Sequence, residues 1–488
     1  MTATRSFGLF INGETLDGSA GGTRDLVEPA SGAPFGTVHL AGNSDVDAAV
    51  TAARAALDGA WGKTGGTERS RLLHALADAI GKNRNELVEL EARNVGKAVS
   101  SVKLEVGGAA ECFRFYASAI GTIGGRSNAM GASLLTYSLK EPVGVVAQIV
   151  PWNYPLLMAV WKLAPALAAG CSVVLKSDPQ TPATALRLAQ LATEVGFPAG
   201  AINVISADGP TTGSYLVGHP GIDKVAFTGS TRTGVEIMKL AAESIKRVTL
   251  ELGGKSPNVL FADADLASAI PASAWAIFYA SGQSCEARSR LLVEKSIYDE
   301  VVAKLTEAAA KIVQGDPLVA ETQVGSLISL AQRERVHGFV QRAIAAGGTA
   351  VSGGAIPDGP GAFYPPTIIT GLDNAAEIAQ EEVFGPVVTV IPFEDEADAI
   401  RIANDTRYGL FATVWTGDPA RALRVAGRIK SGMVGVNMPY TAFPGIPFGG
   451  YKQSGFGREL SVDAIDAYLE TKGILVNTGN RPINPFGL

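Results

Sequence analysis

The segment Val143-Gly-Val-Val-Ala-Gln-Ile-Val150 predicts a buried strand, and a helical segment follows it. Ser172-Val-Val-Leu-Lys176 predicts a second strand of the same kind, and the alternation continues through 202–205 and 224–228 to Arg247-Val-Thr-Leu-Glu251. Strands that alternate with helices are typical of a parallel sheet with helices packed against it. This stretch therefore predicts an α/β protein whose ligands bind at the carboxyl ends of the strands.

Regular secondary structure is also predicted before and after this stretch of the chain. Upstream, apolar residues recur every three or four positions from Asp45, over 67–92 and over 102–120, which predicts three helices. Downstream, a second α/β unit begins near Ser256, and 468–476 predict a terminal strand rather than a free tail. We therefore expect two α/β units without an internal repeat or a low-complexity linker.

The composition is that of an ordinary globular protein. The chain has 488 residues and a mass of 50.4 kDa, which suggests roughly three domains. Its 41 Lys and Arg against 47 Asp and Glu give a net charge of −6, so there is no basic excess to bind a phosphate backbone. With 47% hydrophobic and 18% charged residues, the chain can bury large cores. These numbers argue against disorder and against nucleic acid as a partner.

Little in the sequence favours metal, disulfide or membrane chemistry. Cys112, Cys171 and Cys285 form no CxxC pair, and the four histidines have no HExxH-type spacing, so we expect neither a disulfide framework nor a metal site. The N-terminal residues have no apolar run like that of a signal peptide. No apolar stretch reaches the ~18 residues of a membrane span. We expect a soluble, cytoplasmic protein that binds no membrane.

Cys285 is the first candidate for chemistry. It lies in Ser281-Gly-Gln-Ser-Cys-Glu-Ala-Arg-Ser289, on a glycine-containing connection between a predicted helix and a predicted strand. A thiol in such a place is accessible to whatever binds there and can act as a nucleophile. The alternative is a buried apolar cysteine, which is common and which we expect for Cys112 and Cys171.

Two polar side chains follow strands of the first unit. Glu251 ends its strand before Leu252-Gly-Gly-Lys-Ser-Pro257, where a carboxylate can act as a general base or can simply be solvated. Asn153 lies in Pro151-Trp-Asn-Tyr-Pro155, where two prolines restrict the backbone. An amide held in this way can stabilise an oxyanion, or it can cap a structural turn.

Two further segments could hold a phosphate. Phe227-Thr-Gly-Ser-Thr-Arg-Thr-Gly234 is a strand–turn–helix whose backbone N–H groups could bind one, although glycine turns are common between strands and helices. Lys176 ends its strand before Ser177-Asp-Pro-Gln-Thr-Pro182 and could meet a phosphate or a ribose. The alternative for Lys176 is an ordinary surface lysine.

Taken together and in order, these segments resemble the aldehyde dehydrogenase superfamily. The resemblance runs from Phe10-Ile-Asn-Gly13 to Tyr468-Leu-Glu-Thr-Lys472, nearly the whole chain. The matching motifs are Pro151-Trp-Asn-Tyr-Pro155, Trp161-Lys-Leu-Ala-Pro-Ala-Leu167, Phe227-Thr-Gly-Ser-Thr231, Leu250-Glu-Leu-Gly-Gly-Lys-Ser-Pro257, Gly282-Gln-Ser-Cys285, Glu381-Glu-Val-Phe-Gly-Pro386 and Pro447-Phe-Gly-Gly-Tyr-Lys-Gln-Ser-Gly455. Each motif alone is weak evidence for the family. The specificity comes from all seven motifs occurring in the order in which the family has them.

The resemblance implies oxidation of an aldehyde to a carboxylic acid, with NAD(P) as hydride acceptor. Cys285 matches the nucleophile, which forms first a thiohemiacetal and then a thioester. Glu251 matches the base that activates water, and Asn153 matches the amide of the oxyanion hole. No histidine is near Cys285 in the sequence to help it ionise, and Glu286 would oppose ionisation if its side chain faced the thiol.

The implied contacts form two sets. Cofactor contacts are implied at Trp152, Lys176, Gly209, Phe227, Gly229, Ser230, Gly234, Leu252, Glu382 and Phe384. Substrate contacts are implied at Tyr154, Met158, Trp161, Ser284, Tyr440 and Phe448. This aromatic and mostly neutral lining suits an apolar or aromatic aldehyde.

The resemblance also implies three domains. These are a Rossmann-type dinucleotide-binding domain of residues 1–125 and 143–253, an α/β catalytic domain of 254–468, and a small β-flap of 126–142 and 469–488. In the family the flap bridges subunits, so we expect a homodimer or homotetramer.

One position bears on the choice of cofactor. NAD-preferring members of the family often have Glu three residues after the strand-end lysine, and this chain has Pro179 there. Without that carboxylate, which would repel a 2′-phosphate, we expect NAD as the cofactor and leave NADP open. Two other functions stay open as well: a thiol esterase that uses Cys285 and Glu251 without redox chemistry, and a catalytically silent binding protein.

Overall fold

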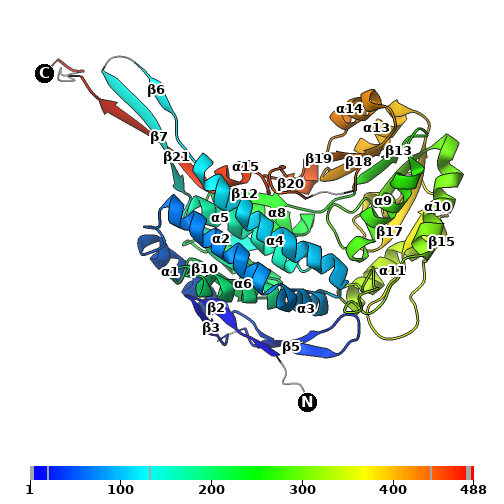
Figure 1. Ribbon diagram of the computed structural model, residues 1–488, viewed down its shortest axis with the longest axis horizontal. Helices are drawn as coiled ribbons and strands as arrows, with labels where there is room; N and C mark the ends of the chain where they lie inside the picture. Colours follow the sequence, from blue (N-terminus) through cyan, green and yellow to red (C-terminus); the bar gives the residue numbers. More distant parts are fainter. Residues whose placement is uncertain (1–4, 19–20, 131–132, 440–441, 480–484, 488) are drawn as a thin grey trace.

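The computed structural model describes residues 5–18, 21–130, 133–439, 442–479 and 485–487. Two α/β units lie side by side, and a long β-arm projects from them (Figure 1). Helices α1 to α8 surround the first sheet, and α9 to α14 surround the second. The arrangement confirms the α/β fold class predicted from the sequence.

The first sheet has eight strands among the described residues, in the order β20-β12-β11-β8-β9-β10-β2-β3. The five strands from β12 to β10 run parallel, and the outer strands pair antiparallel. The bounds are β2 Leu9–Ile11, β3 Glu14–Leu16, β8 Val145–Ile149, β9 Ser172–Ser177, β10 Ile202–Ser206, β11 Lys224–Thr228, β12 Arg247–Glu251 and β20 Gly455–Phe456.

Both faces of this sheet are covered, which explains its sequence pattern. In β8, Val146 packs into the core on one face, whereas Val145 and Ala147 pack into the core on the other. The first face carries α2 Gly66–Lys82, α3 Arg84–Val95, α4 Val99–Ala119, α5 Pro155–Ala169 and α6 Ala183–Glu194. The second face carries α1 Asn43–Asp58, α7 Ser214–Gly218 and α8 Thr231–Ala242. Parallel strands buried on both sides are apolar throughout instead of alternating.

The helix predicted over 67–92 is wrong in one respect, because it is two helices. α2 ends at Lys82 and α3 begins at Arg84. Between them, Asn83 has φ −98° and ψ 18°, and its Nδ2 donates to the carbonyl oxygen of Ala79 at 2.8 Å. The side chain thus competes for a helix carbonyl, as Asn does at helix ends. The apolar stripe continues across this break, so its periodicity could not reveal it.

The second sheet has seven strands among the described residues, in the order β15-β16-β17-β14-β13-β18-β19. All pairs except β15–β16 are parallel. Its strands are β13 Pro257–Leu260, β14 Arg290–Glu294, β15 Thr349–Ser352, β16 Thr367–Thr370, β17 Val387–Phe393, β18 Phe411–Trp415 and β19 Met433–Val436. The helices around it are α9 Leu266–Phe278, α10 Tyr298–Ala310, α11 Leu330–Ala345, α12 Glu377–Gln380, α13 Glu396–Asn404 and α14 Pro419–Arg428.

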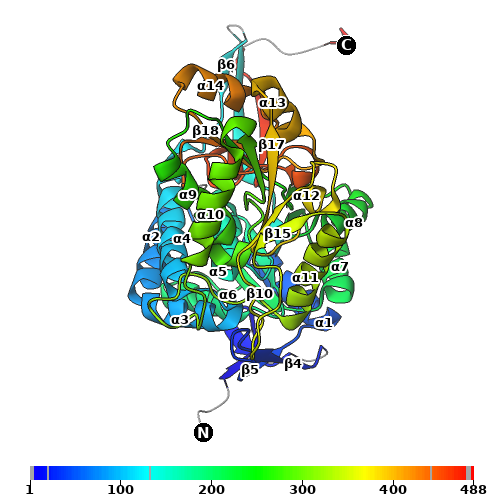
Figure 2. The ribbon, with the colours of Figure 1, turned by 90° about the vertical axis from the view of Figure 1, so that its right-hand side faces the viewer.

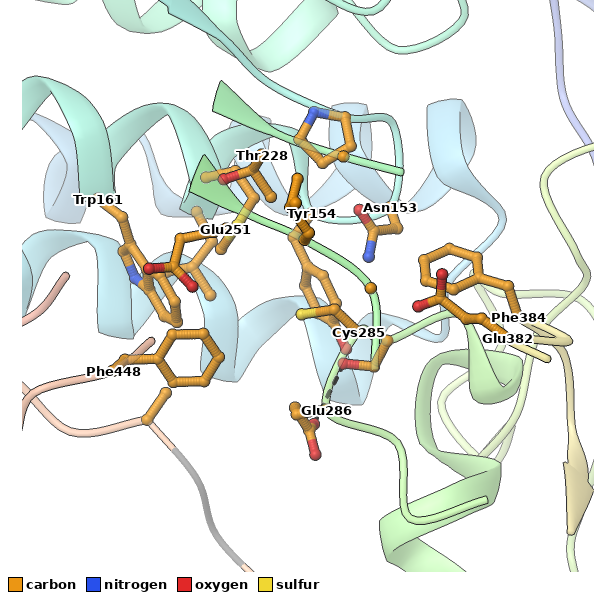
Figure 3. A pocket seen from close by; sticks show the side chains of 18 of the residues that line it. Asn153, Tyr154, Trp161, Thr228, Glu251, Cys285, Glu286, Glu382, Phe384 and Phe448 are labelled. Atoms are coloured by element: carbon orange, nitrogen blue, oxygen red, sulfur yellow. Dashed lines mark hydrogen bonds between the residues drawn. The ribbon is translucent and has the colours of Figure 1, made fainter. Parts of the chain in front are cut away.

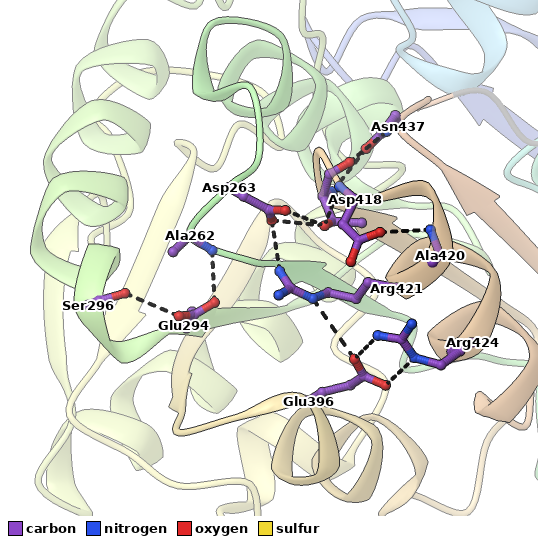
Figure 4. Close-up of polar contacts among 11 residues, drawn as sticks. Ala262, Asp263, Glu294, Ser296, Glu396, Asp418, Ala420, Arg421, Arg424 and Asn437 are labelled. Carbon is purple, nitrogen blue, oxygen red and sulfur yellow. Dashed lines mark hydrogen bonds and ion pairs between the residues drawn. The ribbon is translucent and has the colours of Figure 1, made fainter.

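A polar network connects the outer helices of the second sheet to its strand ends (Figure 4). Arg421 on α14 lies 3.0 Å from Asp263, which follows β13, and Arg424 lies 2.8 Å from Glu396 on α13. These side chains are 27–54% exposed, so each pair contributes only about 0–1 kcal/mol. The network orients α13 and α14 more than it stabilises the fold.

Two small sheets complete the described structure. β1 Arg5–Phe7, β5 Pro34–His39 and β4 Thr23–Val27 form one. β6 Ser127–Ala129, β7 Leu134–Pro142 and β21 Leu469–Asn477 form the projecting arm, so the predicted terminal strand is confirmed. The short helix α15 Asp463–Asp466 precedes β21, and no helix in the described ranges is long and apolar enough to cross a membrane.

Candidate active site

The carboxyl ends of the first sheet open onto a cavity of about 770 Å³. Residues following β8, β11 and β12 line one part of it, and the connection between α9 and β14 lines another. Thr228 and Glu251 are register neighbours at the ends of β11 and β12, and both side chains face this space. The cavity is therefore where the alternating pattern of strands and helices predicts a ligand site.

A strained turn places Cys285 on the cavity wall. After α9, Ala280, Ser281 and Gly282 have φ of 50°, 57° and 68°, the left-handed region that non-glycine residues rarely adopt. The Ser281 hydroxyl donates to the carbonyl oxygen of Gly325 at 3.0 Å, and a Cβ on Gly282 would lie 2.1 Å from the carbonyl oxygen of Gly385. Strain of this kind costs about 1–3 kcal/mol per residue and persists only where its surroundings enforce it.

The electrostatic surroundings of Cys285 oppose ionisation. The side chain is half-buried and lines the cavity. Burial is the main cause that raises the pKa of this thiol well above its ordinary value, and the nearby carboxyls of Glu286, Glu382 and Glu251 raise it further. Its own backbone N–H acts in the opposite direction. Burial and the three carboxyls thus favour the thiol over the thiolate at Cys285.

Glu251 is a buried carboxylate with free lone pairs. It is 5% exposed, and neither carboxylate oxygen has a hydrogen-bond partner within the described ranges. Burial, followed by the like charge of Glu459, raises its pKa well above the ordinary value, while Lys162 lowers it. A carboxylate that is unsatisfied and easily protonated is suited to take a proton from water.

Asn153 is fixed beside the cysteine loop. Its Nδ2 donates to the carbonyl oxygen of Gln283 at 2.8 Å, two residues before Cys285. One of its two N–H hydrogens is thereby used, and the other is available to an oxygen in the cavity. Figure 3 shows Asn153, Cys285 and Glu251 around the same space, although they come from three separate segments.

The opposite part of the wall has the features of a dinucleotide site. α8 begins after Ser230, whose hydroxyl accepts the Thr233 N–H at 3.2 Å, and the turn before it is Gly229. The Oγ1 of Thr228 is buried without a partner among the described residues. A Cβ on Gly253 would lie 2.3 Å from Glu382 Oε2, so a larger residue there would displace the Glu382 carboxylate. An unpartnered hydroxyl beside a glycine turn and a helix start fits a phosphate-bearing cofactor.

Glu382 and Phe384 complete this part of the wall. The N–H of Gly254 donates to Glu382 Oε1 at 3.1 Å, and burial raises the pKa of Glu382 to about 7. The rings of Trp152 and Phe384 meet edge to face with centroids 5.2 Å apart. Phe384 has φ 59°, so it is a strained non-glycine position in addition to Ala280 and Ser281.

Four predicted cofactor residues do not line this cavity. Lys176 is 5% exposed, and its Nζ donates to the carbonyl oxygen of Ser177 at 3.3 Å. Burial lowers the pKa of Lys176. Phe227 lies within β11, Gly234 packs against Leu252, and Gly209 opens a turn that ends beside Lys176. These residues support the wall or lie along a separate surface at the ends of β9 and β10.

The predicted substrate residues gather on the aromatic side of the cavity. Tyr154, Met158, Trp161, Ser284 and Phe448 all line it. The rings of Trp161 and Phe448 lie 5.1 Å apart, edge to face (Figure 3). Tyr440 lies outside the described residues.

Sequence reasoning missed part of this wall. The additional side chains come mainly from α4, α9 and the segment that follows α9, and they are Leu104, Glu105, Leu157, Trp275 and Tyr279. Nothing local marks them, since they belong to ordinary amphipathic helices. The burial of Glu105, which is 5% exposed, appears only in the folded chain, so the sequence offered no signal for it.

Glu286 also lines the cavity, and the structure shows its partners. Its carboxylate pairs with Arg288 and accepts the Ser284 hydroxyl at 3.1 Å. The carboxyl of Glu286 still raises the pKa of the Cys285 thiol, as expected from the sequence for a side chain that faces it, while Arg288 holds that carboxyl in place.

A thiol, a free carboxylate and an amide on one cavity between two α/β sheets define an enzyme whose chemistry depends on a cysteine. Comparisons with known proteins identify its family. A sequence model described as the aldehyde dehydrogenase family matches residues 16–474. The chain therefore belongs to the aldehyde dehydrogenase family, and its activity is the oxidation of aldehydes.

Individual relatives cover nearly the whole chain. An aldehyde dehydrogenase of Emericella nidulans is 44% identical over 474 residues, 97% of this chain and 95% of its own. The 2-hydroxymuconic semialdehyde dehydrogenase of a Pseudomonas species is 41% identical over 478 residues, 96% of this chain and 98% of its own. The solved NAD+ complex of an aldehyde dehydrogenase from Bacillus cereus matches at a TM-score of 0.96 and 42% identity, covering 97% of both chains.

Proposed function

We propose that this enzyme oxidises an aldehyde to the carboxylic acid with NAD as hydride acceptor, through a covalent intermediate on Cys285. The observation that carries this proposal is that Cys285, Glu251 and Asn153 line one cavity whose other wall fits a dinucleotide. The test is the absorbance of reduced nicotinamide during turnover of an aldehyde panel with NAD and with NADP. Ester hydrolysis without any such signal would instead favour a thiol esterase.

In the first half of the reaction, the Cys285 thiol gives up its proton to solvent in the cavity, its sulfur bonds to the carbonyl carbon, and the electron pair of the C=O bond moves to the carbonyl oxygen, which becomes an oxyanion. The free N–H of Asn153 and the Cys285 backbone N–H are the donors for that oxygen. One donor of this kind contributes roughly 3 kcal/mol to the transition state. Since both donors are held by the fold, they need no reorganisation as charge develops.

NAD, when bound, supplies the acceptor for the hydride that leaves the substrate carbon. We propose that Trp152, Gly229, Ser230, Leu252, Glu382 and Phe384 hold it at the described cavity, and that Lys176, Gly209, Phe227 and Gly234 shape the adjoining surface. In the second half of the reaction, Glu251 takes a proton from the water that attacks the Cys285 thioester, and the acid leaves.

The cofactor's 2′-position is the basis of one prediction. Lys176 is buried, and its ammonium has few partners, so a phosphate near it would gain a charge-assisted hydrogen bond. Lys176→Met keeps the length and removes the charge. We expect kcat/KM with NADP to fall about tenfold or more relative to that with NAD.

The control is Lys239→Met, which removes an exposed lysine that pairs with Glu236 on α8. It should leave both efficiencies unchanged. Equal losses with the two cofactors in Lys176→Met would show that the 2′-position is read elsewhere.

The domain division follows the sheets. We propose the dinucleotide-binding domain as 1–125 and 143–253, the catalytic domain as 254–468, and the flap as 126–142 and 469–488. The two large sheets and the arm support this division. One strand crosses it, because β20 belongs to the range 254–468 and pairs with β12 of the first sheet. A cytoplasmic location belongs to the same proposal, supported by the three unpaired cysteines.

We also propose that the arm joins subunits in a dimer or tetramer. A three-stranded sheet with both faces in water is marginal alone, and its edges invite pairing. Leu135 and Val476 are cross-strand partners, and they are 44% and 37% exposed. Leu139, on the same face, is 40% exposed. A second copy of the chain would bury this row.

Leu135→Asp with Leu139→Asp should therefore lower the mass measured by light scattering to that of a smaller species. Both leucines are exposed in the single chain, so the substitutions should not destabilise the fold of the subunit. Any decrease in the thermal unfolding temperature should come from the loss of subunit contacts. Leu423→Asp, at a 75% exposed position on α14, is the control and should leave the mass unchanged. An unchanged mass in the double variant would exclude this face.

A further inference from the structure

The substrate side of the cavity combines aromatic rings with two carboxylates. Glu105 and Glu286 line it, whereas their positively charged partners Lys97 and Arg288 are not among the described residues of the wall. Both cations are 1% exposed and lie behind their carboxylates. The wall thus presents acceptor oxygens to a substrate and keeps the compensating positive charge out of contact.

Arg288 is held by a complete set of contacts. Its Nε donates to the Thr413 hydroxyl at 3.2 Å, Nη1 donates to Glu286, and Nη2 donates to the carbonyl oxygen of Pro439. Its guanidinium carbon lies 4.7 Å from the centre of the Phe411 ring. Because every guanidinium nitrogen has an acceptor, the side chain has one orientation, and so does the carboxylate it holds.

Glu286 retains acceptor capacity toward the cavity. An ionised carboxylate has about four lone-pair sites. The contacts described for Glu286 are those from Arg288 and from the Ser284 hydroxyl, 3.1 Å from Oε1 (Figure 3). The carboxylate of Glu286 is the negative side of its ion pair with Arg288, and it faces the cavity. Because the pair is neutral overall, an uncharged donor is enough to hydrogen-bond the remaining lone pairs of Glu286.

We propose that Glu286, oriented by Arg288, is a specificity-determining residue that accepts a hydrogen bond from a hydroxyl group of the aldehyde and disfavours aldehydes that bear a carboxylate. This inference rests on the proposed function, because it assumes that the aldehyde binds at Cys285, the residue directly before Glu286. It narrows the expectation of an apolar aldehyde to an aromatic or aliphatic aldehyde that carries a hydroxyl.

The two side chains can be separated by their charges. Glu286→Gln leaves the positive charge of Arg288 uncompensated at the wall. Arg288→Gln leaves the negative charge of Glu286 uncompensated beside the thiol. The double variant Glu286→Gln with Arg288→Gln is neutral and keeps amides of similar size at both positions. The three variants therefore distinguish a charge effect from a packing effect.

The experiment measures kcat/KM for benzaldehyde, 3-hydroxybenzaldehyde and 3-carboxybenzaldehyde, which share one rigid skeleton. The wild-type enzyme should prefer the hydroxyl compound over benzaldehyde by about tenfold and take the carboxylate compound least well. Glu286→Gln should lose the hydroxyl preference and gain about tenfold for the carboxylate compound relative to benzaldehyde. The double variant should lose the preference without that gain.

Unchanged ratios in Glu286→Gln, or a wild-type enzyme that does not prefer the hydroxyl compound, would overturn the inference. Wild-type enzyme that oxidises none of the three aldehydes with NAD or NADP would instead count against the proposed function. Circular dichroism of each variant before assay shows whether it is folded, and the double variant tests the inference even if one single variant is not.

Arg288 has its own readout as a positioning residue. The charged groups facing the thiol are the carboxyls of Glu251, Glu286 and Glu382, with Arg288 behind Glu286. Arg288→Gln should move the pH dependence of Cys285 alkylation by iodoacetamide to higher pH, and Arg288→Lys should restore it. Cys112 and Cys171 are buried and should not contribute. An unmoved profile in Arg288→Gln would contradict the positioning role.

Discussion

Replacing Cys285 by Ser should abolish aldehyde oxidation, with a loss in kcat of about 10⁴-fold or more. A serine hydroxyl is far less acidic than a thiol, and this wall already raises the pKa of the residue at 285 by burial and by three carboxyls. Cys112 and Cys171 cannot replace it, because both are fully buried and neither lines the cavity. Steady-state formation of reduced nicotinamide measures the loss.

Cofactor binding should survive in Cys285→Ser, because the residues proposed to hold NAD come from the segments that follow β8, β11, β12 and α12. Quenching of tryptophan fluorescence by NAD checks this point. Cys112→Ala is the control, since Cys112 is fully buried in α4 and away from the cavity. Turnover in Cys285→Ser near the wild-type rate would remove the nucleophile assignment and with it the proposed mechanism.

The sheets could be predicted because burial leaves a direct mark on their sequences. β8 and β11 are covered on both faces, so each appears as an apolar run that a helical segment follows. Where a structural feature depends on one side chain, the hydrophobic pattern does not predict it. The break at Asn83 arises from a hydrogen bond to Ala79, and no change of periodicity accompanies it.

The site divides in the same way. Asn153, Glu251 and Cys285 could be proposed because they follow strands or helices whose ends converge, and because their motifs resemble a family. Glu105 and Tyr279 could not, because α4 and the end of α9 meet only in the folded chain, where the Tyr279 hydroxyl donates to Glu105 at 3.2 Å. The orientation of Glu286 depends on Arg288, whose remaining contacts come from distant segments.

The pH dependence of turnover follows from Cys285 and Glu251 together. Both act in their deprotonated forms, and burial raises the pKa of each. Activity is therefore lost as pH falls, and the loss should begin at a higher pH than the ordinary pKa of a carboxyl would give. A profile of kcat/KM that stayed flat down to pH 5 would contradict a raised pKa for the base.

Glu251→Gln should separate the two halves of the reaction. Glutamine fits the same space but cannot take a proton, so hydrolysis of the thioester should slow by about 10²-fold or more. Glu251 is proposed as the base for the hydrolytic water only. Bond formation by Cys285 does not use it, so the first turnover should continue. Rapid mixing should show a burst of reduced nicotinamide close to one per active site, followed by a slow steady rate.

The matched control is Glu294→Gln. Glu294 also ends a parallel strand, but its Oε2 accepts the Ala262 N–H at 2.9 Å and it lies away from the cavity (Figure 4). Its substitution should leave both phases intact. The comparison isolates what is particular to Glu251, a buried carboxylate whose two oxygens have no partner in the described parts of the chain. If burst and steady state fell equally in Glu251→Gln, the residue would serve the cavity's structure rather than deacylation.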